Sequence, residues 1–208
     1  MNLTSESKFF LSIIVGSALV LGIAAFALSR PTPVITIPKE TLIPADAHVM
    51  GSSSASAYLV EFSDFQCPAC GAFEPAVESL MTKYSDRLLF SYRHFPLPQH
   101  KEAQPAAMVA EAASLQGKFW EMHKLLFANQ SSLSESMYEN LAKQLELNMT
   151  KFNTDRKDSS LSAIITKDTD SGVTLGINAT PTFYLNGVKL DLTGPDDLKV
   201  AVEKALSH

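Results

Sequence analysis

Residues 58–74 read YLVEFSDFQCPACGAFE and contain both cysteines of the chain, Cys67 and Cys70. A run of strand-forming residues, Tyr58–Phe62, comes just before them. Pro68 suits the first turn of a helix, where a missing N–H costs nothing, and apolar residues then recur at helical spacing up to Tyr84. The sequence therefore predicts a strand followed by a helix that begins near Cys67.

This placement gives the two cysteines a chemical role. Positions i and i+3 of a helix lie about 5–6 Å apart, so a disulfide can open and close with little backbone movement. The N–H groups and dipole of the helix N-terminus favour a thiolate on Cys67, and Cys70, one turn later, should be buried as the resolving thiol. We interpret the pair as redox-active.

Two other interpretations of the cysteine pair are weaker. Half of a zinc site would need two more ligands, and the five histidines of the chain form no obvious second pair. A purely structural disulfide that closes so small a loop would add little stability. We therefore expect no metal and no organic cofactor.

The flanking sequence predicts an α/β fold with a mixed sheet. Leu88–Tyr92 reads as a second strand that completes a βαβ unit. A helical pattern then runs over about 103–175, and Thr182–Leu185 returns to strand. Asn186-Gly187 predicts a type I′ hairpin into Val188–Leu190, and a last helix starts at Gly194-Pro195.

A proline far along the chain supports the redox interpretation. Pro181 follows Thr180 directly before the third predicted strand. By itself it could be an ordinary strand-edge or turn residue, but together with a CxxC pair it predicts a cis-proline loop beside the disulfide.

At this point the sequence resembles the DsbA-like branch of the thioredoxin superfamily, of the membrane-anchored bacterial type. The matching stretches are VEFSDFQCPACGAFEP, YRHFPLPQH, AEAASLQGKFWEMHKLLFANQ and GINATPTFYLNG, within residues 48–208. The resemblance implies a thioredoxin fold interrupted by a helical domain. It also implies a protein thiol–disulfide oxidoreductase that introduces disulfides into exported proteins.

The resemblance also assigns individual residues. It makes Cys67 the exposed, attacked sulfur, Cys70 its partner and Pro181 the cis-proline. The residues expected to contact the substrate peptide are Thr180, Pro68 and Ala69. Glu61, six residues before Cys67, matches a buried acid that would shuttle a proton near Cys70, although a charged residue at a strand edge is the alternative.

Other matched positions favour structure over catalysis. His94 and His100 match family positions in the loop after the second strand, where hydrogen bonding is the favoured role. The Phe119-Trp120 pair is most simply core packing.

One residue departs from the pattern of strong oxidants. They often carry histidine directly before the second cysteine, where this chain has Ala69, so the strength of oxidation stays open. A membrane-anchored reductase with the opposite electron flow is therefore one alternative, and a non-catalytic thioredoxin-fold binding module is another. The expected partners are exported proteins with free thiols and, by resemblance, a membrane quinone-linked reoxidant of DsbB or VKOR type.

The N-terminal segment predicts a membrane anchor. Residues 9–28, FFLSIIVGSALVLGIAAFAL, carry no charge, and as a helix they would be about 30 Å long, the thickness of a bilayer core. Ala25-Phe26-Ala27 allows a cleaved signal peptide as the alternative. We expect a cytoplasmic segment at 1–8, a signal-anchor transmembrane helix at 9–28 and a proline-rich linker at 29–47. The domain at 48–208 would then lie on the extracytoplasmic side of the cell membrane.

The charge of the chain excludes one class of partner. Its 17 basic and 22 acidic residues are scattered, so no basic face suggests binding to nucleic acid.

Overall fold

The computed structural model describes residues 9, 14, 16–23, 26 and 35–207, which divide into the units Met1–Ile35 and Thr36–His208. The described residues between 9 and 26 are helical. In the described part of the chain, no helix is long and apolar enough to cross a membrane. The expected segment at 1–8 and much of the expected anchor at 9–28 lie outside the described residues, so the anchor stays a prediction.

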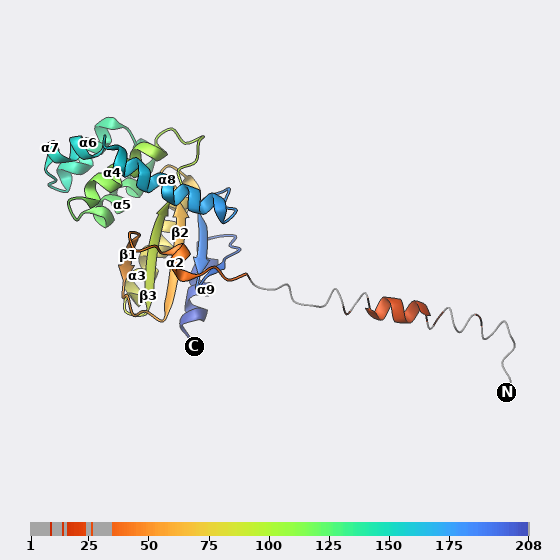
Figure 1. The fold of residues 1–208 in the computed structure, drawn as a ribbon. Coiled ribbons are helices and arrows are strands. Elements are labelled where there is room, and N and C mark those ends of the chain that lie inside the picture. The colour runs from red at the N-terminus through yellow and green to blue at the C-terminus, as the bar shows by residue number, and fades with distance from the viewer. Residues whose placement is uncertain (1–8, 10–13, 15, 24–25, 27–34, 208) are drawn as a thin grey trace. The chain divides into compact units, whose positions relative to one another are not determined.

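The second unit is built on a five-stranded mixed sheet with the strand order β1-β3-β2-β4-β5 (Figure 1). Strands β2 and β3 are parallel, and the other neighbours are antiparallel. The strands are β1 (His48–Gly51), β2 (Ala57–Ser63), β3 (Leu88–His94), β4 (Thr182–Leu185) and β5 (Val188–Lys189). The expected mixed α/β fold is confirmed.

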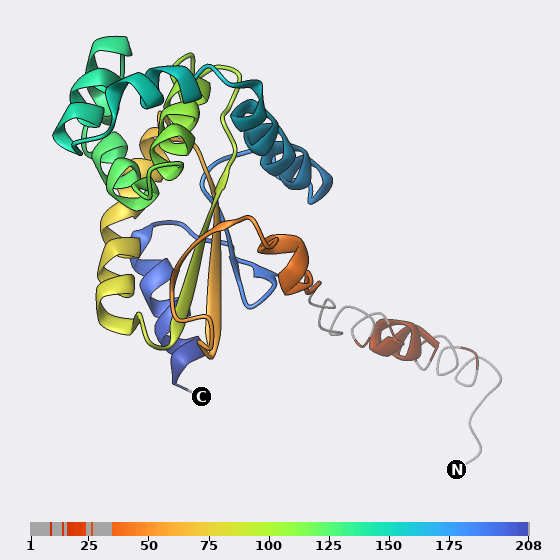
Figure 2. The same ribbon diagram turned by 60° about the vertical axis from the view of Figure 1, so that its left-hand side comes forward.

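Helices cover both faces of this sheet (Figure 2). On one face lie α3 (Pro68–Tyr84) and α9 (Pro195–Leu206), and on the other lie α2 (Lys39–Leu42) and α8 (Ser159–Thr174). Because side chains alternate along a strand, β2 contributes to two separate cores. Leu59 packs in the larger core with α3 and α9, whereas Val60 and Phe62 pack with Leu42 of α2. Glu61 and Ser63 share the face of Leu59, which is the side of α3.

The helical segment between β3 and β4 contains five α-helices and a short 3-10 helix. They are α4 (Ala103–Ser114), α5 (Phe119–Ala128), η1 (Gln130–Ser132), α6 (Glu135–Gln144), α7 (Met149–Asp155) and α8. Gly117, with a positive φ of 72°, separates α4 from α5. Asn148 caps α7, where its side-chain oxygen accepts a hydrogen bond from the Lys151 amide at 3.0 Å. Helices α4 to α7 stand together at one end of the sheet (Figure 1).

The hairpin between β4 and β5 has the predicted turn. Leu185 pairs with Val188, and the two residues between them have positive φ, 50° at Asn186 and 86° at Gly187. A type I′ turn requires this combination. The hairpin prediction is confirmed.

The structure differs from the expected linker at 29–47 over the linker's second half. From residue 36 the chain folds onto the sheet: the Ile37 amide donates to the Gly187 carbonyl at 2.8 Å, and Leu42 of α2 is fully buried. Pro38 does not prevent this, because it stands at the N-cap of α2, where its missing N–H is not needed. The edge strand β1, which the sequence did not predict, continues this segment along β3.

Candidate active site

Cys67 and Cys70 lie at the start of α3, as the sequence predicted. Cys67 is the N-cap residue in an extended conformation, with φ −73° and ψ 117°, and Pro68 begins the helix. The Cys67 amide donates to the Asp64 carbonyl at 3.0 Å, and the Cys67 carbonyl accepts from Gly71 at 3.2 Å. Both cysteines are free thiols, so the structure describes the reduced form. Cys70 is fully buried, as expected.

The loop before β4 lies against Cys67. The Thr180–Pro181 peptide bond is cis, as predicted, and the Cys67 thiol donates to the Thr180 carbonyl at 3.4 Å. Strand pairing brings these distant residues together, because Phe62 of β2 lies opposite Thr182 of β4. Cys67 keeps only 6% of its surface exposed, less than the exposed sulfur that the family resemblance implied. The Thr180 loop accounts for the difference, since it contacts the sulfur directly.

The environments of the two thiols push their pKa values apart. Hydrogen bonds from the Cys70 thiol and then from backbone N–H groups of Cys70 and Ala69 lower the pKa of Cys67, against the opposing effect of burial. Burial raises the pKa of Cys70 well above its ordinary range, and the neighbouring Cys67 and Glu61 raise it further. The site therefore favours a Cys67 thiolate beside a protonated Cys70.

Glu61 lies in the central strand β2 and is only 1% exposed, so its alternative interpretation as a strand-edge charge is wrong. Burial raises the pKa of Glu61 to about 8, and the charge of Glu74 contributes to this shift. Because Glu61 also raises the pKa of Cys70, the two groups interact across the α3 face of the sheet. This carboxyl can hold a proton at neutral pH close to the buried thiol.

Several buried polar groups around the thiols, Glu61 among them, have no hydrogen-bond partner among the described protein atoms. They include Oε2 of Glu61, the hydroxyl of Tyr92 and Oγ1 of Thr180. The Ser63 hydroxyl is close enough to lower the pKa values of Glu61, Cys70 and Tyr92, but it reaches hydrogen-bond geometry with none of them. Such groups are rare in protein interiors, and several of them lie together here.

Two residues that hold the loop before α3 were missed by the sequence analysis. The Asp64 carboxylate accepts from the Gln66 amide at 2.7 Å, the Leu97 amide at 2.9 Å and Nδ1 of His100 at 2.7 Å. The Gln130 side chain donates to the carbonyls of Phe65 and Cys67 at 2.8 and 2.9 Å. Asp64 could have been suspected from its place three residues before Cys67, whereas nothing local identifies Gln130.

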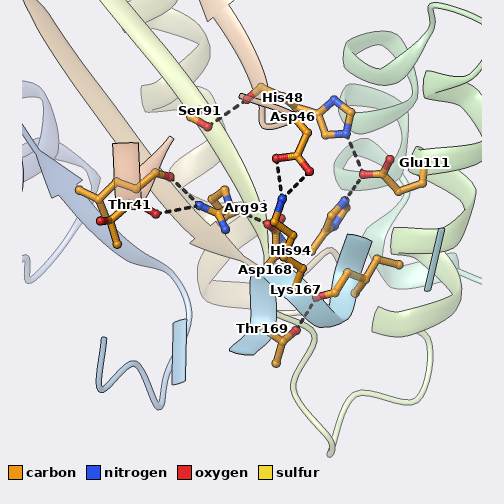
Figure 3. A network of polar contacts seen from close by, with 12 residues as sticks. Thr41, Asp46, His48, Ser91, Arg93, His94, Glu111, Lys167, Asp168 and Thr169 are labelled. Carbon is orange, nitrogen blue, oxygen red and sulfur yellow. Dashed lines mark hydrogen bonds and ion pairs between the residues drawn. The ribbon is translucent and has the colours of Figure 1, made fainter. Parts of the chain in front are cut away.

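His94, which is the last residue of β3 rather than part of the loop, and His100 in the loop both have hydrogen-bonding contacts, the role that the sequence favoured for them. His100 binds Asp64, and Nε2 of His94 lies 2.8 Å from Oε1 of Glu111 (Figure 3). Burial would raise the pKa of Glu111, but hydrogen bonds from His48 and His94 outweigh it and lower that pKa to about 2. Phe119 is buried in the core and the Trp120 indole donates to the Val49 carbonyl at 3.1 Å.

A surface pocket of about 380 Å³ lies beside the thiols. Its lining includes Ala69 and Phe73 from α3, Pro181 from the cis-proline loop, Lys189 at the end of β5 and residues 190–193 after it. Pro68 and Ala69 are exposed, so both are accessible to a peptide that approaches Cys67. Of the three predicted substrate contacts, only Thr180 is buried, and it presents its carbonyl to the sulfur.

Comparison with protein families identifies the domain. A family model described as thioredoxin matches residues 45–204. Among curated proteins, the Na(+)/H(+) antiporter NhaA 3 of Salinispora tropica is 39% identical over 152 residues, which is 71% of this chain and 23% of the antiporter. NhaA 1 of Mycolicibacterium vanbaalenii is 36% identical over 179 residues, 83% of this chain and 29% of that protein. The chain thus spans less than a third of the length of these relatives.

Solved structures share the fold over most of their length. The thiol-disulfide exchange protein alpha-DsbA2 of Wolbachia pipientis has a TM-score of 0.72 at 20% identity, covering 80% of this chain and 89% of that one. For oxidised BdbD of Bacillus subtilis the TM-score is 0.68 at 23% identity, and the match covers 85% of this chain and 100% of that one. For DsbA2 of Pseudomonas aeruginosa the TM-score is 0.62 at 25% identity, and the match covers 77% of this chain and 93% of that one. The resemblance to DsbA-like proteins is confirmed.

Proposed function

The chain belongs to the thioredoxin family, and on that premise we propose that it is a protein thiol–disulfide oxidoreductase that oxidises the thiols of exported proteins through Cys67 and Cys70. One observation carries the proposal: Cys67 lies at the N-terminus of α3 with a lowered pKa, one turn from a fully buried Cys70. A binding module without catalysis has no need of two thiols whose pKa values are pushed apart in this way.

The reaction proceeds by two thiol–disulfide exchanges from the Cys67–Cys70 disulfide form. A substrate thiolate attacks Sγ of Cys67, the enzyme disulfide breaks, and Cys70 leaves as a thiolate that takes up a proton. A second substrate thiolate then attacks the substrate sulfur of the mixed disulfide and expels Cys67 as a thiolate. The substrate gains a disulfide, and the enzyme gains two electrons.

Each step uses a feature of the site. Cys67 leaves readily in the second exchange because hydrogen bonds from Cys70 and from backbone N–H groups lower its pKa. Cys70 has a raised pKa, so the thiolate formed in the first exchange needs a proton at once, and the protonated Glu61 supplies it. The exposed Pro68 and Ala69 and the adjoining pocket receive the substrate peptide in extended form.

The same pKa argument supports the proposed direction of electron flow. A stabilised Cys67 thiolate stabilises the reduced enzyme, which makes the disulfide form an oxidant. Because Ala69 contributes no histidine beside the thiols, we expect a reduction potential between those of thioredoxin, about −270 mV, and DsbA, about −120 mV.

We place the catalytic domain on the extracytoplasmic side of the cell membrane, held by residues 9–28. The support is the charge-free length of that segment and the need for an oxidising compartment in which substrate disulfides persist. A membrane quinone-linked reoxidant of DsbB or VKOR type would regenerate the Cys67–Cys70 disulfide. Carbonate extraction of native membranes, followed by N-terminal sequencing, tests the anchor.

Trapping of substrate adducts tests the activity itself. In Cys70→Ser the Cys67 thiolate can still attack a disulfide of an exported protein and expel one of its sulfurs as a thiolate, but no Cys70 thiol remains to reverse this step, so the variant should accumulate adducts on non-reducing gels. Cys67→Ser and the double variant, as controls, should accumulate none. Adducts on Cys70 in the Cys67→Ser variant, and none in the Cys70→Ser variant, would reverse the assignment.

Equilibration with glutathione tests the direction. The proposal predicts a potential more oxidising than about −270 mV and a Cys67–Cys70 disulfide in growing cells. A potential at or below that value, with both cysteines reduced in cells, would instead identify a reductase.

A further inference from the structure

Two histidines and a glutamate meet at the boundary between the sheet and the helical segment, and neither cysteine belongs to this group (Figure 3). His48 comes from the edge strand β1, His94 from the end of β3, and Glu111 from α4. Nε2 of His48 and Nε2 of His94 lie 2.7 and 2.8 Å from the same Oε1 of Glu111. The ligand atoms of all three residues lie within 4.8 Å of one another.

The three side chains are withdrawn from solvent to different degrees. The exposed fractions are 1% for His94 and 3% for Glu111, whereas His48 keeps 18%. The two imidazoles offer one nitrogen ligand each, and the carboxylate buried between them offers an oxygen ligand at the same point. The partial exposure of His48 leaves one side from which a small ion can enter.

The surrounding residues hold these side chains in place. The ring of Phe119 stacks on the His48 ring, with centroids 3.5 Å apart and planes 10° from parallel. Tyr92 packs edge-on against His94 at 5.3 Å. The Ser91 hydroxyl donates to the His48 carbonyl at 3.1 Å, which fixes β1 beside β3. Ligands that are oriented before the ion arrives are typical of metal sites.

We propose that His48, His94 and Glu111 bind a zinc ion, which joins β1 and β3 of the sheet to α4 of the helical segment. Imidazole nitrogens and one carboxylate suit zinc, which is often held by three protein ligands with water as the fourth. Calcium and magnesium prefer six or more oxygen ligands, or octahedral oxygen sites, so they do not fit this donor set.

Binding requires the three side chains to shift. Ligand atoms around a tetrahedral zinc with bonds of about 2.0–2.1 Å lie about 3.3 Å apart. The two N···O contacts of 2.7 and 2.8 Å therefore widen by roughly 0.5 Å, and the two Nε2 atoms, which lie within 4.8 Å of each other, come to the same separation. Nε2 of each histidine then gives its electron pair to the ion and must first lose the proton that it donated to Glu111. A charged ring loses this proton to water. A neutral ring changes its tautomer, so that Nδ1 carries a proton in its place. Glu111 exchanges two N–H donors for the ion and stays charged.

The experiment uses the protein in its Cys67–Cys70 disulfide form, because free thiols would bind zinc themselves. Untagged, chelator-treated protein is titrated with zinc chloride in a calorimeter, with calcium and magnesium chloride in parallel. Thermal unfolding is followed with and without zinc. We expect one zinc ion per chain, a zinc-dependent rise in melting temperature, and no response to calcium or magnesium.

Three variants locate the site. Glu111→Gln keeps the size and an acceptor oxygen but removes the charge, and His48→Gln removes the ligand that is least buried. Even the loss of an outer partner of a metal ligand weakens binding about 10–100-fold, so each variant should lose at least tenfold in zinc affinity. His100→Gln is the matched control, since His100 binds the carboxylate of Asp64 in the same way but has no second histidine beside it.

The outcomes separate a metal site from a purely hydrogen-bonded cluster. Weaker zinc binding in Glu111→Gln and His48→Gln, with His100→Gln unchanged, supports the proposal. It is overturned if the disulfide form binds no zinc, or if both variants keep the parental affinity. Hydrogen exchange of the parental protein gives a second measurement: zinc should slow exchange in β1 and α4 and leave α9 unchanged.

Discussion

Two groups of buried polar residues in this domain differ in how completely they are paired. In the first, Arg93 donates to Asp168 at 2.7 Å and to the Leu42 carbonyl at 2.6 Å, and the other Asp168 oxygen accepts from the His94 amide at 3.0 Å (Figure 3). In the second, around the thiols, Glu61, Tyr92 and Thr180 each keep a buried polar atom that has no hydrogen-bond partner among the residues that the structure describes.

The difference separates structural from chemical use of buried polarity. An unpartnered buried polar group costs about 1–3 kcal/mol, so a fold retains several of them together only where they are needed. The paired group of Arg93 and Asp168 ties α2 and α8 to β3. The unpaired group contains Glu61, which in the proposed function passes a proton to Cys70. Changes in the first should therefore affect stability, and changes in the second should affect the redox reaction and its pH dependence.

The largest effect is expected from Arg93→Met, which breaks the paired group. Arg93 is 1% exposed, and its loss leaves Oδ1 of Asp168 and the Leu42 carbonyl without their donor. Removal of one partner of a buried ion pair costs about 3–5 kcal/mol. Urea unfolding of the disulfide form measures this loss in the free energy of unfolding.

The matched control for Arg93 is Lys83→Met, which breaks the exposed ion pair with Glu203 and should change stability little. If Arg93→Met were as stable as the parent but had an altered reduction potential, the distinction between a structural group and a redox group would be wrong.

Glu61→Gln should have the next largest effect, and it should depend on pH. The folded-state pKa of Glu61, about 8, lies above its ordinary value of 4.5, so the folded form binds more protons between these values. Stability then falls as pH rises through this window, by up to about 1.4 kcal/mol per pH unit from this residue. Glu61→Gln should remove this dependence and be more stable than the parent at pH 8, while reacting more slowly.

Urea unfolding at pH 5 to 8 measures the Glu61 contribution. The disulfide form is used, so that the thiols do not titrate; burial, rather than the charge of Cys67, is the main cause of the raised pKa of Glu61. Glu203→Gln, which alters an exposed carboxylate, is the control. Parallel pH profiles for the parent and Glu61→Gln would show that Glu61 is already ionised at pH 5.

Gln130→Ala should combine the two kinds of effect. The Gln130 side chain is structural, but the structure that it holds is the loop of Cys67. The substitution removes both donors to the Phe65 and Cys67 carbonyls. We expect a loss of about 1–3 kcal/mol in the free energy of unfolding, together with slower substrate oxidation. Gln116→Ala, whose hydrogen bonds to Asn148 are exposed, should cost less than about 0.5 kcal/mol. Equal losses in the two variants would remove Gln130 from the site.

The smallest effect concerns the thiolate of Cys67. Because the hydrogen bond from the Cys70 thiol is the main cause of the lowered Cys67 pKa, Cys70→Ala should raise that pKa. Cys70→Ser keeps a hydroxyl donor and should raise it less. The rate of alkylation by iodoacetamide between pH 4 and 10 measures the midpoint in each variant. Midpoints in both variants equal to that of the parental protein would assign the shift to the helix N-terminus instead.

The elements predicted from sequence are those whose evidence is local. The strand before Cys67, the helix after it and the Asn186-Gly187 hairpin are each specified by neighbouring residues, and all three are present. Pro181 could be assigned to a cis loop because the CxxC pair restricts the fold. The folded segment from residue 36 to β1 was not predicted, because its prolines are typical of spacers and its burial depends on the sheet.

The sequence by itself determined the redox pair, its place at a helix N-terminus and the fold around it. The roles of Asp64, Gln130, His48 and Glu111 were decided only by the tertiary structure. Gln130 binds a carbonyl 63 positions away, and His48 binds Glu111 across the same separation. A local pattern reflects the periodicity of one helix or strand, whereas contacts at such separations depend on how several elements pack together.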